Sequence, residues 1–293
     1  MITLPDYHQQ APEVRERFKA LAARPELLRL EGLTKRFKTG KGEQTVLNGI
    51  DLSVRQREFV TIIGASGCGK STLLRLVSGL DEPSGGSIVM GGEPVDGPGP
   101  DRGMVFQSYS LFPWHTVLRN VAFGLKQRNK GAAIAEAEAR TWIDLVGLAG
   151  YEDHYPAQLS GGMRQRVAIA RALAAGPKVL LMDEPFGALD AQTRCRMQSY
   201  LLEIWKNVDV TILFVTHDLD EAIFLSDRIL VLLPRPGRVG ELIENPVPRP
   251  RTQSQLLSPE FLSVKRRLEE LIHPEEDEDK FHMLKLTPAG DEV

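Results

Sequence analysis

The sequence VTIIGASGCGKST occupies residues 60–72, and LLRLVSGL follows it at residues 73–80. Val60 to Ile63 form a short apolar run of the kind found in buried strands, and the second segment favours a helix. A strand, a glycine-rich turn and a helix in this order are the pattern of a phosphate-binding loop. A flexible glycine turn without a ligand is the alternative, but the flanking strand and helix favour the phosphate site.

The side chains of this loop suit different parts of a nucleoside triphosphate. Its glycines allow backbone N–H groups to turn toward phosphate oxygens, and the helix that follows offers its positive end to the same anion. We expect Lys70 to reach the β- and γ-phosphates, Ser71 to place its hydroxyl on Mg²⁺ and Thr72 to make another phosphate contact. Cys68 is expected to contribute only its backbone N–H. The predicted nucleotide-binding loop comprises Gly64, Ala65, Ser66, Gly67, Cys68, Gly69, Lys70, Ser71 and Thr72.

A pair of acidic residues follows another apolar strand in VLLMDEP, residues 179–185. In α/β sheets, ligands bind at the carboxyl ends of strands, where Asp183 and Glu184 stand. Asp183 suits a direct or indirect hold on Mg²⁺, and Glu184 suits the base that orients and deprotonates an attacking water. Two solvated carboxylates at a strand end are the alternative, and the glycine loop in the same chain argues against it.

A histidine stands at the end of a further apolar strand, Thr211–Val215, in the sequence VTHD. A lone histidine is more often a structural residue than a catalytic one. The strand-end position favours a functional interpretation in this case, because it matches the positions of the glycine loop and of Asp183. We expect His217 to hydrogen-bond the γ-phosphate or the attacking water.

A second anion site is predicted in LSGGMRQRVAIARAL, residues 159–173. Ser160 suits the cap of a helix, and Gly161 and Gly162 leave backbone N–H groups bare at its positive end. One chain would thus carry two phosphate-binding helix starts. A nucleotide shared between two copies of the chain would explain both.

Strand and helix patterns alternate along most of the chain, which predicts a layered α/β core. Three Ala- and Leu-rich segments with helical period interrupt the strands as a helical subdomain, at Val117–Leu125, Ala132–Val146 and Met163–Ala174. The predicted strands are Leu28–Leu33, Val60–Ile63, Ile88–Met90, Met104–Phe106, Val179–Met182, Thr211–Val215 and Ile229–Leu233.

The two ends of the chain differ from this core. Residues Ala11–Ala23 predict a short appended helix that Pro25 ends. Beyond Leu233, the proline-rich sequences PRPGR and NPVPRPR predict loops and extended linkers. Residues Phe261–Ile272 outline an amphipathic helix, and the acidic run Glu275–Asp279 indicates a solvated segment.

The composition excludes several classes of protein. With 42% hydrophobic and 26% charged residues, the 293-residue chain is typical of a folded protein, and no apolar run is long enough to cross a bilayer. The start MITLPDYHQQ lacks the features of a secretory signal, so we expect a cytoplasmic protein. Two cysteines predict no disulfide framework. The last twenty residues carry a charge of −5 and leave the rest at +2, without a basic stripe for nucleic acid.

Together these motifs resemble those of the ATP-binding subunits of ABC transporters, over about residues 28–233. The family's Walker A loop, signature LSGGM, Walker B strand VLLMDEP, D-loop GALD (Gly187–Asp190) and switch His217 occur in the family's order. The resemblance implies a P-loop NTPase core of ABC ATPase type with an inserted helical subdomain at about residues 108–176. It also implies three regions: an appended helix at 1–27, the ATPase domain at 28–248, and a helix with an acidic tail at 249–293.

The resemblance further implies the roles of individual residues. Gln107 in MVFQSYS matches the family's Q-loop glutamine, which contacts Mg²⁺ and water and links to the membrane partner. Phe37 falls where the family stacks an aromatic ring on adenine, and Asp190 belongs to the nucleotide-binding D-loop. In the implied head-to-tail dimer, ATP on Lys70 of one copy is covered by Ser160, Gly161 and Gly162 of the other. Met163 departs from the family's usual glutamine.

One branch of the family is especially similar. The run DRGMVFQSYSLFPWHTVLRNVAFGLK, residues 101–126, and the sequence PRPGR resemble the branch that imports nitrate, sulfonates and taurine. Residues Ser108–Thr116 lie where this family docks its permease, and Tyr109, Phe112 and Trp114 suit a helix-in-groove contact as exposed aromatics. Ordinary packing of these aromatics inside the helical subdomain is the alternative.

These resemblances predict an ATP-hydrolysing, energy-coupling subunit of an importer for a small oxyanion such as nitrate, a sulfonate or taurine. Its expected place is the inner face of the cell membrane. Its expected partners are permease subunits, a second ATPase subunit and a solute-binding protein, with no nucleic acid. One alternative is a soluble ABC-type ATPase acting on ribosomes or DNA. Another is a regulatory protein that binds ATP without turnover, against which the presence of Glu184 and His217 argues.

Overall fold

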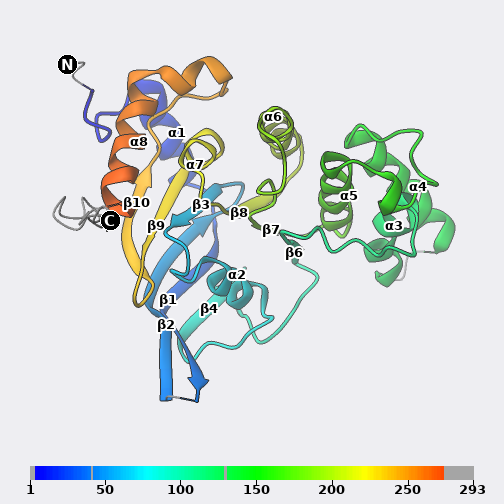
Figure 1. The fold of residues 1–293 in the computed structure, drawn as a ribbon, viewed down its shortest axis with the longest axis horizontal. Helices are drawn as coiled ribbons and strands as arrows, with labels where there is room; N and C mark the ends of the chain where they lie inside the picture. The colour runs from blue at the N-terminus through cyan, green and yellow to red at the C-terminus, as the bar shows by residue number, and fades with distance from the viewer. Residues whose placement is uncertain (1–3, 41, 129–130, 274–293) are drawn as a thin grey trace, which may run out of the picture.

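Two sheets organise the part of the chain that the computed structural model describes, residues 4–40, 42–128 and 131–273 (Figure 1). The larger sheet has the strand order β10–β9–β3–β8–β7–β6, and all its neighbours are parallel except β10, which runs antiparallel to β9. The smaller sheet has the antiparallel order β2–β1–β4–β5. Helices pack around the strands, which confirms the predicted α/β class.

The observed elements overlap every strand and helix predicted above. The strands are β1 (Glu26–Thr39), β2 (Gly42–Arg55), β3 (Phe59–Gly64), β4 (Gly85–Met90), β5 (Glu93–Pro94), β6 (Arg102–Val105), β7 (Val179–Asp183), β8 (Thr211–Val215), β9 (Arg228–Leu233) and β10 (Arg238–Glu244). The helices are α1 (Pro12–Ala22), α2 (Lys70–Ser78), α3 (Val117–Gln127), α4 (Ala132–Leu145), α5 (Gly161–Ala174), α6 (Ala191–Asn207), α7 (Leu219–Leu225) and α8 (Pro259–Ile272), with 3-10 turns η1 (Pro156–Gln158) and η2 (Gln253–Leu257). None of the described helices combines the length and apolar character needed to cross a bilayer.

The sequence analysis missed strand β10, which lies between the proline-rich sequences PRPGR and NPVPRPR and closes the edge of the larger sheet. The two proline-rich sequences themselves form turns and loops up to the first residue of β10, as predicted. An edge strand pairs with a neighbour on one side and is open to water on the other, so it needs few apolar residues. In β10, only Ile243 is buried. Strand β2 escaped prediction for a similar reason, because the first half of this hairpin strand is polar and largely exposed.

The central strands owe their position to burial on both faces. Every residue of β3 and β8 is buried, and β7 is buried up to Met182. Continuous apolar runs of this kind are typical of parallel strands covered by helices on both sides. Because β3, β7 and β8 are parallel neighbours, their carboxyl ends meet at one edge of the sheet.

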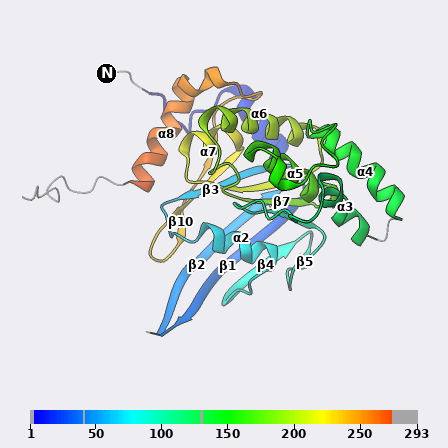
Figure 2. The same ribbon diagram turned by 45° about the vertical axis from the view of Figure 1, so that its right-hand side comes forward.

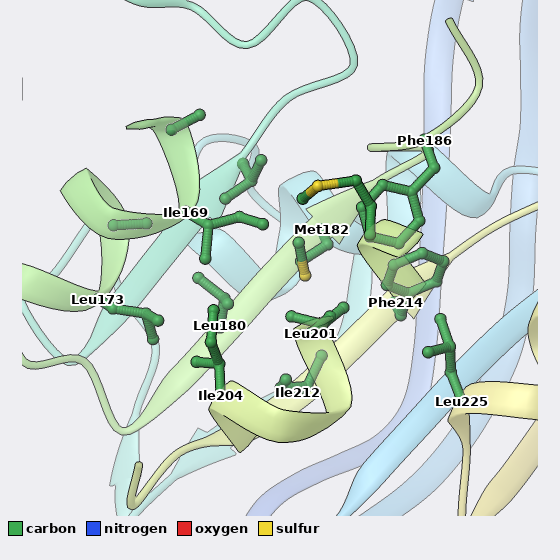
Figure 3. Close-up of a cluster of buried hydrophobic side chains, with 14 of the residues drawn as sticks. Ile169, Leu173, Leu180, Met182, Phe186, Leu201, Ile204, Ile212, Phe214 and Leu225 are labelled. Atoms are coloured by element: carbon green, nitrogen blue, oxygen red, sulfur yellow. The ribbon is translucent and has the colours of Figure 1, made fainter. Parts of the chain in front are cut away.

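Helices α3, α4 and α5 form a lobe between β6 and β7, at one end of the molecule in Figures 1 and 2. A shared apolar core joins this lobe to the sheet (Figure 3). Its buried side chains include Ile169 and Leu173 of α5, Leu201 and Ile204 of α6, Leu180 and Met182 of β7, and Ile212 and Phe214 of β8. We propose that this lobe spans about residues 108–176 and that the ATPase domain spans residues 28–248.

A buried ion cluster fixes both ends of the described chain to the sheet. Asp227, which precedes β9, accepts hydrogen bonds from Arg249 Nε at 2.8 Å and from the Phe59 N–H at 3.0 Å. Arg17 of α1 donates to the carbonyls of Asn245 and Val247. Burial acts to raise the pKa of Asp227, but Arg249, Arg17, the Phe59 N–H and Arg251 outweigh it, so this pKa is lowered.

We expect Asp227→Asn to lower the free energy of unfolding at pH 7 by about 3 kcal/mol, because it leaves buried arginines without their carboxylate. A carboxylate with a lowered pKa stabilises the fold above its unfolded pKa of about 3.9 and loses this effect as pH falls through its folded pKa. The difference from wild type should therefore shrink below about pH 4. Urea unfolding of the wild type and the variant at pH 7 and below about pH 4 measures this difference, and the exposed Asp209→Asn is the control. A difference that does not change with pH would contradict the role of the ionised carboxylate.

Candidate nucleotide site

The glycine loop between β3 and α2 has a backbone that few other residues would allow. Gly67 and Gly69 have φ values of 76° and 100°, in the left-handed region that favours glycine. A Cβ atom on Gly64 would lie 2.2 Å from the Leu232 carbonyl oxygen. Helix α2 begins at Lys70 without a side-chain cap, so its first N–H groups have no partner within the helix. These bare groups form an anion-binding helix start.

Lys70 is held over this loop by backbone carbonyls. Its Nζ donates to Gly64 O at 2.8 Å and to Ala65 O at 3.2 Å, and the residue is only 7% exposed. Neither of these hydrogen bonds goes to a carboxylate. The ammonium group is therefore well placed to attract the phosphates of a nucleotide bound by the loop.

Ser71 and Asp183 meet beside the loop, because the start of α2 faces the end of β7. The Ser71 Oγ donates to Asp183 Oδ1 at 3.0 Å. Burial raises the pKa of Asp183, and the Glu184 carboxylate raises it further, against the lowering effects of Ser71 and Lys70. A nearby cation would relieve this cost. One hydroxyl and one carboxylate suit Mg²⁺, which takes its other oxygen ligands from phosphates and water. The pair therefore fits the predicted metal site.

Glu184 and His217 form a hydrogen-bonded pair at the neighbouring strand ends, with Glu184 Oε2 and His217 Nδ1 3.0 Å apart. Glu184 has a φ of 43°, unusual for a residue with a side chain, and its N–H donates to Val215 O at 3.0 Å. This left-handed turn directs the chain away from the sheet just after β7. The Glu184 side chain is 23% exposed and that of His217 is 65% exposed, so the pair can reach a ligand from solvent.

Gln107 approaches the same pair across Gly187. A Cβ atom on Gly187 would lie 3.9 Å from Gln107 Nε2 and 4.0 Å from Glu184 Oε2. The absence of a side chain at Gly187 thus leaves an open space beside both groups. The structure therefore brings together the predicted residues Lys70, Ser71, Gln107, Asp183, Glu184 and His217.

The signature residues Ser160, Gly161 and Gly162 lie elsewhere, at the start of α5 in the helical lobe. Ser160 caps the helix by accepting from the Met163 N–H at 3.3 Å. Cβ atoms on the two glycines would approach Leu189 and Thr193, around the start of α6, which Asp190 caps. Within the described residues, no hydrogen bond joins the signature to the glycine loop of the same chain. A groove of about 390 Å³ adjoins the signature.

Phe37 lies on the β1–β2 hairpin and is 40% exposed, with the Lys35 Nζ 4.9 Å from its ring centre. The same hairpin reaches the glycine loop further along, since a Cβ atom on Gly69 would lie within 3.4 Å of Val46 and Leu47 side-chain atoms. An exposed ring on an element that contacts the loop is compatible with the predicted adenine contact.

The loop after Gln107 corrects part of the sequence prediction. Tyr109 was expected to be exposed, but it is only 9% exposed, and Phe112 is half-buried. Tyr109 and Ser110 have φ values of 62° and 47°, and this tight turn folds the tyrosine inward. Trp114, at 67% exposure, is the residue that matches the expectation.

Sequence reasoning missed the two residues that hold this loop in place. Buried Asn120 of α3 accepts from the Phe112 N–H and donates to the carbonyls of Phe112, His115 and Thr116. Arg171 of α5 donates to Ser110 O at 2.7 Å and to Tyr109 O at 3.1 Å. A polar residue within the apolar stripe of a predicted helix was the signal that could have identified Asn120.

Comparisons with known proteins identify the family. A family model described as ABC transporter matches residues 47–187. An uncharacterised ABC transporter ATP-binding protein of Methanocaldococcus jannaschii is 49% identical over 85% of this chain and 92% of its own. A nitrate import ATP-binding protein of Synechocystis sp. is 46% identical over 86% of this chain and 97% of its own. A bicarbonate transport ATP-binding protein of the same organism is 49% identical over 78% of this chain and 35% of its own.

Solved structures give the same result. A dimeric ATP-binding cassette in a post-hydrolysis state, bound to ADP and Pi, has a TM-score of 0.67 and 33% identity over 74% of this chain and 98% of its own. The protein cbiO1 of Clostridium perfringens, part of an ABC transporter complex, has a TM-score of 0.68 and 28% identity over 85% of this chain and 96% of its own. The chain belongs to the ABC transporter ATP-binding protein family and is an ATPase.

We expect Lys70→Ala to weaken ATP binding by about tenfold or more, because a charge-assisted contact to phosphate is lost. Titration of the purified protein with a fluorescent ATP analogue measures this affinity. The exposed Lys178→Ala is the matched control and should bind as wild type does. Unchanged affinity in Lys70→Ala would refute the role of the ammonium group.

We expect Glu184→Gln to reduce ATP turnover by at least about 100-fold, because an amide cannot accept the proton of the attacking water. ATP binding should persist, so size-exclusion chromatography with ATP should show a trapped dimer. Turnover is measured as phosphate release, and the same substitution at the exposed Glu82, Glu82→Gln, is the matched control. Hydrolysis by Glu184→Gln at a rate near wild type would show that another group is the base.

Proposed function

We propose that this ATPase is the energy-coupling subunit of an importer for a small oxyanion, with nitrate as the first candidate. The observation that carries the proposal is the 46% identity to a nitrate import ATP-binding protein along almost the whole length of that relative. The similarity to a bicarbonate transport protein supports an oxyanion more generally. Sulfonates and taurine remain candidates within the same proposal.

In the proposed hydrolysis step, the residues of the glycine loop and of the strand ends have separate roles. The bare N–H groups of the glycine loop and the Lys70 ammonium hold the phosphates in place, and Thr72 adds a contact. Ser71, Asp183 and Gln107 would hold Mg²⁺, which when bound neutralises charge on the β- and γ-phosphates. Glu184 orients a water and accepts its proton. His217, bonded to Glu184, positions this carboxylate and contacts the γ-phosphate.

The signature completes the site from a second subunit in this proposal. Gly161 and Gly162 start α5, where their N–H groups have no partner within the helix. No hydrogen bond among the described residues brings them to Lys70 of the same chain, and the dimeric cassette among the similar structures supports a pair of chains, which we propose to be head-to-tail. ATP would then be enclosed by two chains, and hydrolysis would release the contact between them.

The surface of the helical lobe supports the proposed permease partner. Exposed Trp114 stands on a loop fixed by Asn120 and Arg171, so an apolar anchor is presented on a rigid support. We propose that a permease helix docks on this loop at the inner face of the membrane, and that a solute-binding protein delivers the oxyanion from the other side. The alternative of a ribosome- or DNA-directed ATPase gains no support from the relatives, whose names concern transport.

We expect Trp114→Ala to reduce association with the permease by about tenfold or more, as the loss of a buried aromatic anchor does at interfaces. Co-purification of the tagged chain from gently solubilised membranes measures this. Leu257→Ala is the matched control, because Leu257 is an 81% exposed apolar residue outside the lobe. Equal permease recovery with both variants would move the docking site elsewhere.

The substrate is tested by reconstitution. The chain, its co-purified permease and the associated solute-binding protein are placed in proteoliposomes, and ATPase activity is measured with nitrate, bicarbonate, taurine or no solute. We expect nitrate to stimulate hydrolysis. Stimulation by none of these oxyanions, with an intact complex, would overturn the substrate class while leaving the ATPase assignment in place.

A further inference from the structure

A groove of about 550 Å³ lies between the C-terminal half of α6 and residues 249–251, away from the nucleotide site. Its apolar wall is built from Leu202, Trp205 and Pro250. Trp205 is fixed from two sides, because its ring meets Phe59 edge-on and Arg249 stacks over it at 4.5 Å. The wall is therefore a rigid apolar surface of a size that suits a small organic molecule.

Two of the residues that line this groove each have one buried donor without an acceptor. The Trp205 indole N–H and the Arg251 Nε–H are both buried without a hydrogen-bond partner. Both groups can only donate. An unpartnered buried donor costs free energy, so these two lining residues carry donor capacity that the protein itself does not use.

The charges of the lining are mainly positive. Lys206, Arg249 and Arg251 line the groove, and Glu203 is the one acidic residue among the side chains that line it. The Glu203 carboxylate already accepts from Asn207 Nδ2 at 3.1 Å. Asp227, beneath the wall, pairs with Arg249. The groove thus keeps an excess of positive charge.

Arg251 is a buried cation whose hydrogen bonds go to backbone carbonyls. Its hydrogen bonds go to the carbonyls of Ile223, Phe224, Ser226 and Val247, and none of them goes to a carboxylate. Burial lowers its pKa well below the ordinary value, and the neighbouring charges of Arg249 and Arg17 lower it further. A guanidinium in this position is stabilised by any anion that approaches it.

We propose that this groove binds a small organic anion, with an apolar body against Leu202, Trp205 and Pro250 and one carboxylate-type group facing Lys206, Arg249 and Arg251. The ligand is a free small molecule, and the site is independent of the nucleotide and of the oxyanion proposed above as transported solute. Nitrate or bicarbonate alone would leave the apolar wall uncovered. Arg251 also donates to carbonyls at the C-terminal end of α7, so the proposed site adjoins that end of the helix.

Titration of the full-length protein with octanoate, followed by tryptophan fluorescence, tests the proposal. We expect a saturable change that is lost in Trp205→Phe, since Trp205 is one of three tryptophans and the one in the groove. Octanamide has the same shape without the charge and should bind about tenfold more weakly. Equal binding of acid and amide, or no saturable binding, would overturn the proposal.

A charge-reversal pair locates the site. Lys206→Glu should weaken octanoate binding by about tenfold, whereas Lys178→Glu, the same change elsewhere on the surface, should leave it unchanged. Equal effects of both variants would contradict a local site. The acidic residues 275–279, which lie outside the described residues, are the competing occupant. If octanoate bound only after their replacement by Gln and Asn, the groove would belong to the chain's own tail and the small-molecule proposal would fall.

Discussion

The meeting of β3, β7 and β8 at one edge of the larger sheet is the constraint on which the rest of the molecule depends. Parallel pairing sets Asp183 of β7 and Ile62 of β3 on either side of Val215 of β8, so the loops after these strands are neighbours although they are far apart in sequence. Burial on both faces holds these strands in the interior, because their apolar side chains pack on either side of the sheet. The phosphate loop, the acidic pair and His217 are thereby brought together in space although they are distant in sequence.

Most of the larger sheet and of the candidate site could be predicted from the sequence. Apolar runs indicate the strands, and the residue after each run lies at the edge of the sheet. Asp183, Glu184 and His217 were found in this way. Other features carry no local signal. Strand β10 is exposed and follows prolines, and Tyr109 turns inward only because residues 109 and 110 adopt left-handed conformations. The partners of Asn120 and Arg171 are backbone carbonyls, which no side-chain pattern reveals.

The helical lobe and the sheet divide the work of the molecule. The sheet edge holds the groups that suit hydrolysis, whereas the lobe holds the signature and the exposed Trp114. A continuous apolar core from α5 and α6 to β7 and β8 joins them. In the proposed transport cycle, this connection transmits the closure of two chains around ATP to the permease.

The proposed mechanism depends above all on a nucleotide shared between two chains, and a disulfide between two copies measures this sharing most directly. Ser66→Cys in the glycine loop and Ser160→Cys in the signature are combined in a chain whose Cys68 and Cys195 are replaced by serine. With ATP and Glu184→Gln, we expect an oxidant to link the two chains into a covalent dimer, whereas ADP or no nucleotide should give little product. Equal cross-linking with and without ATP, or none under any condition, would contradict a nucleotide held between two chains.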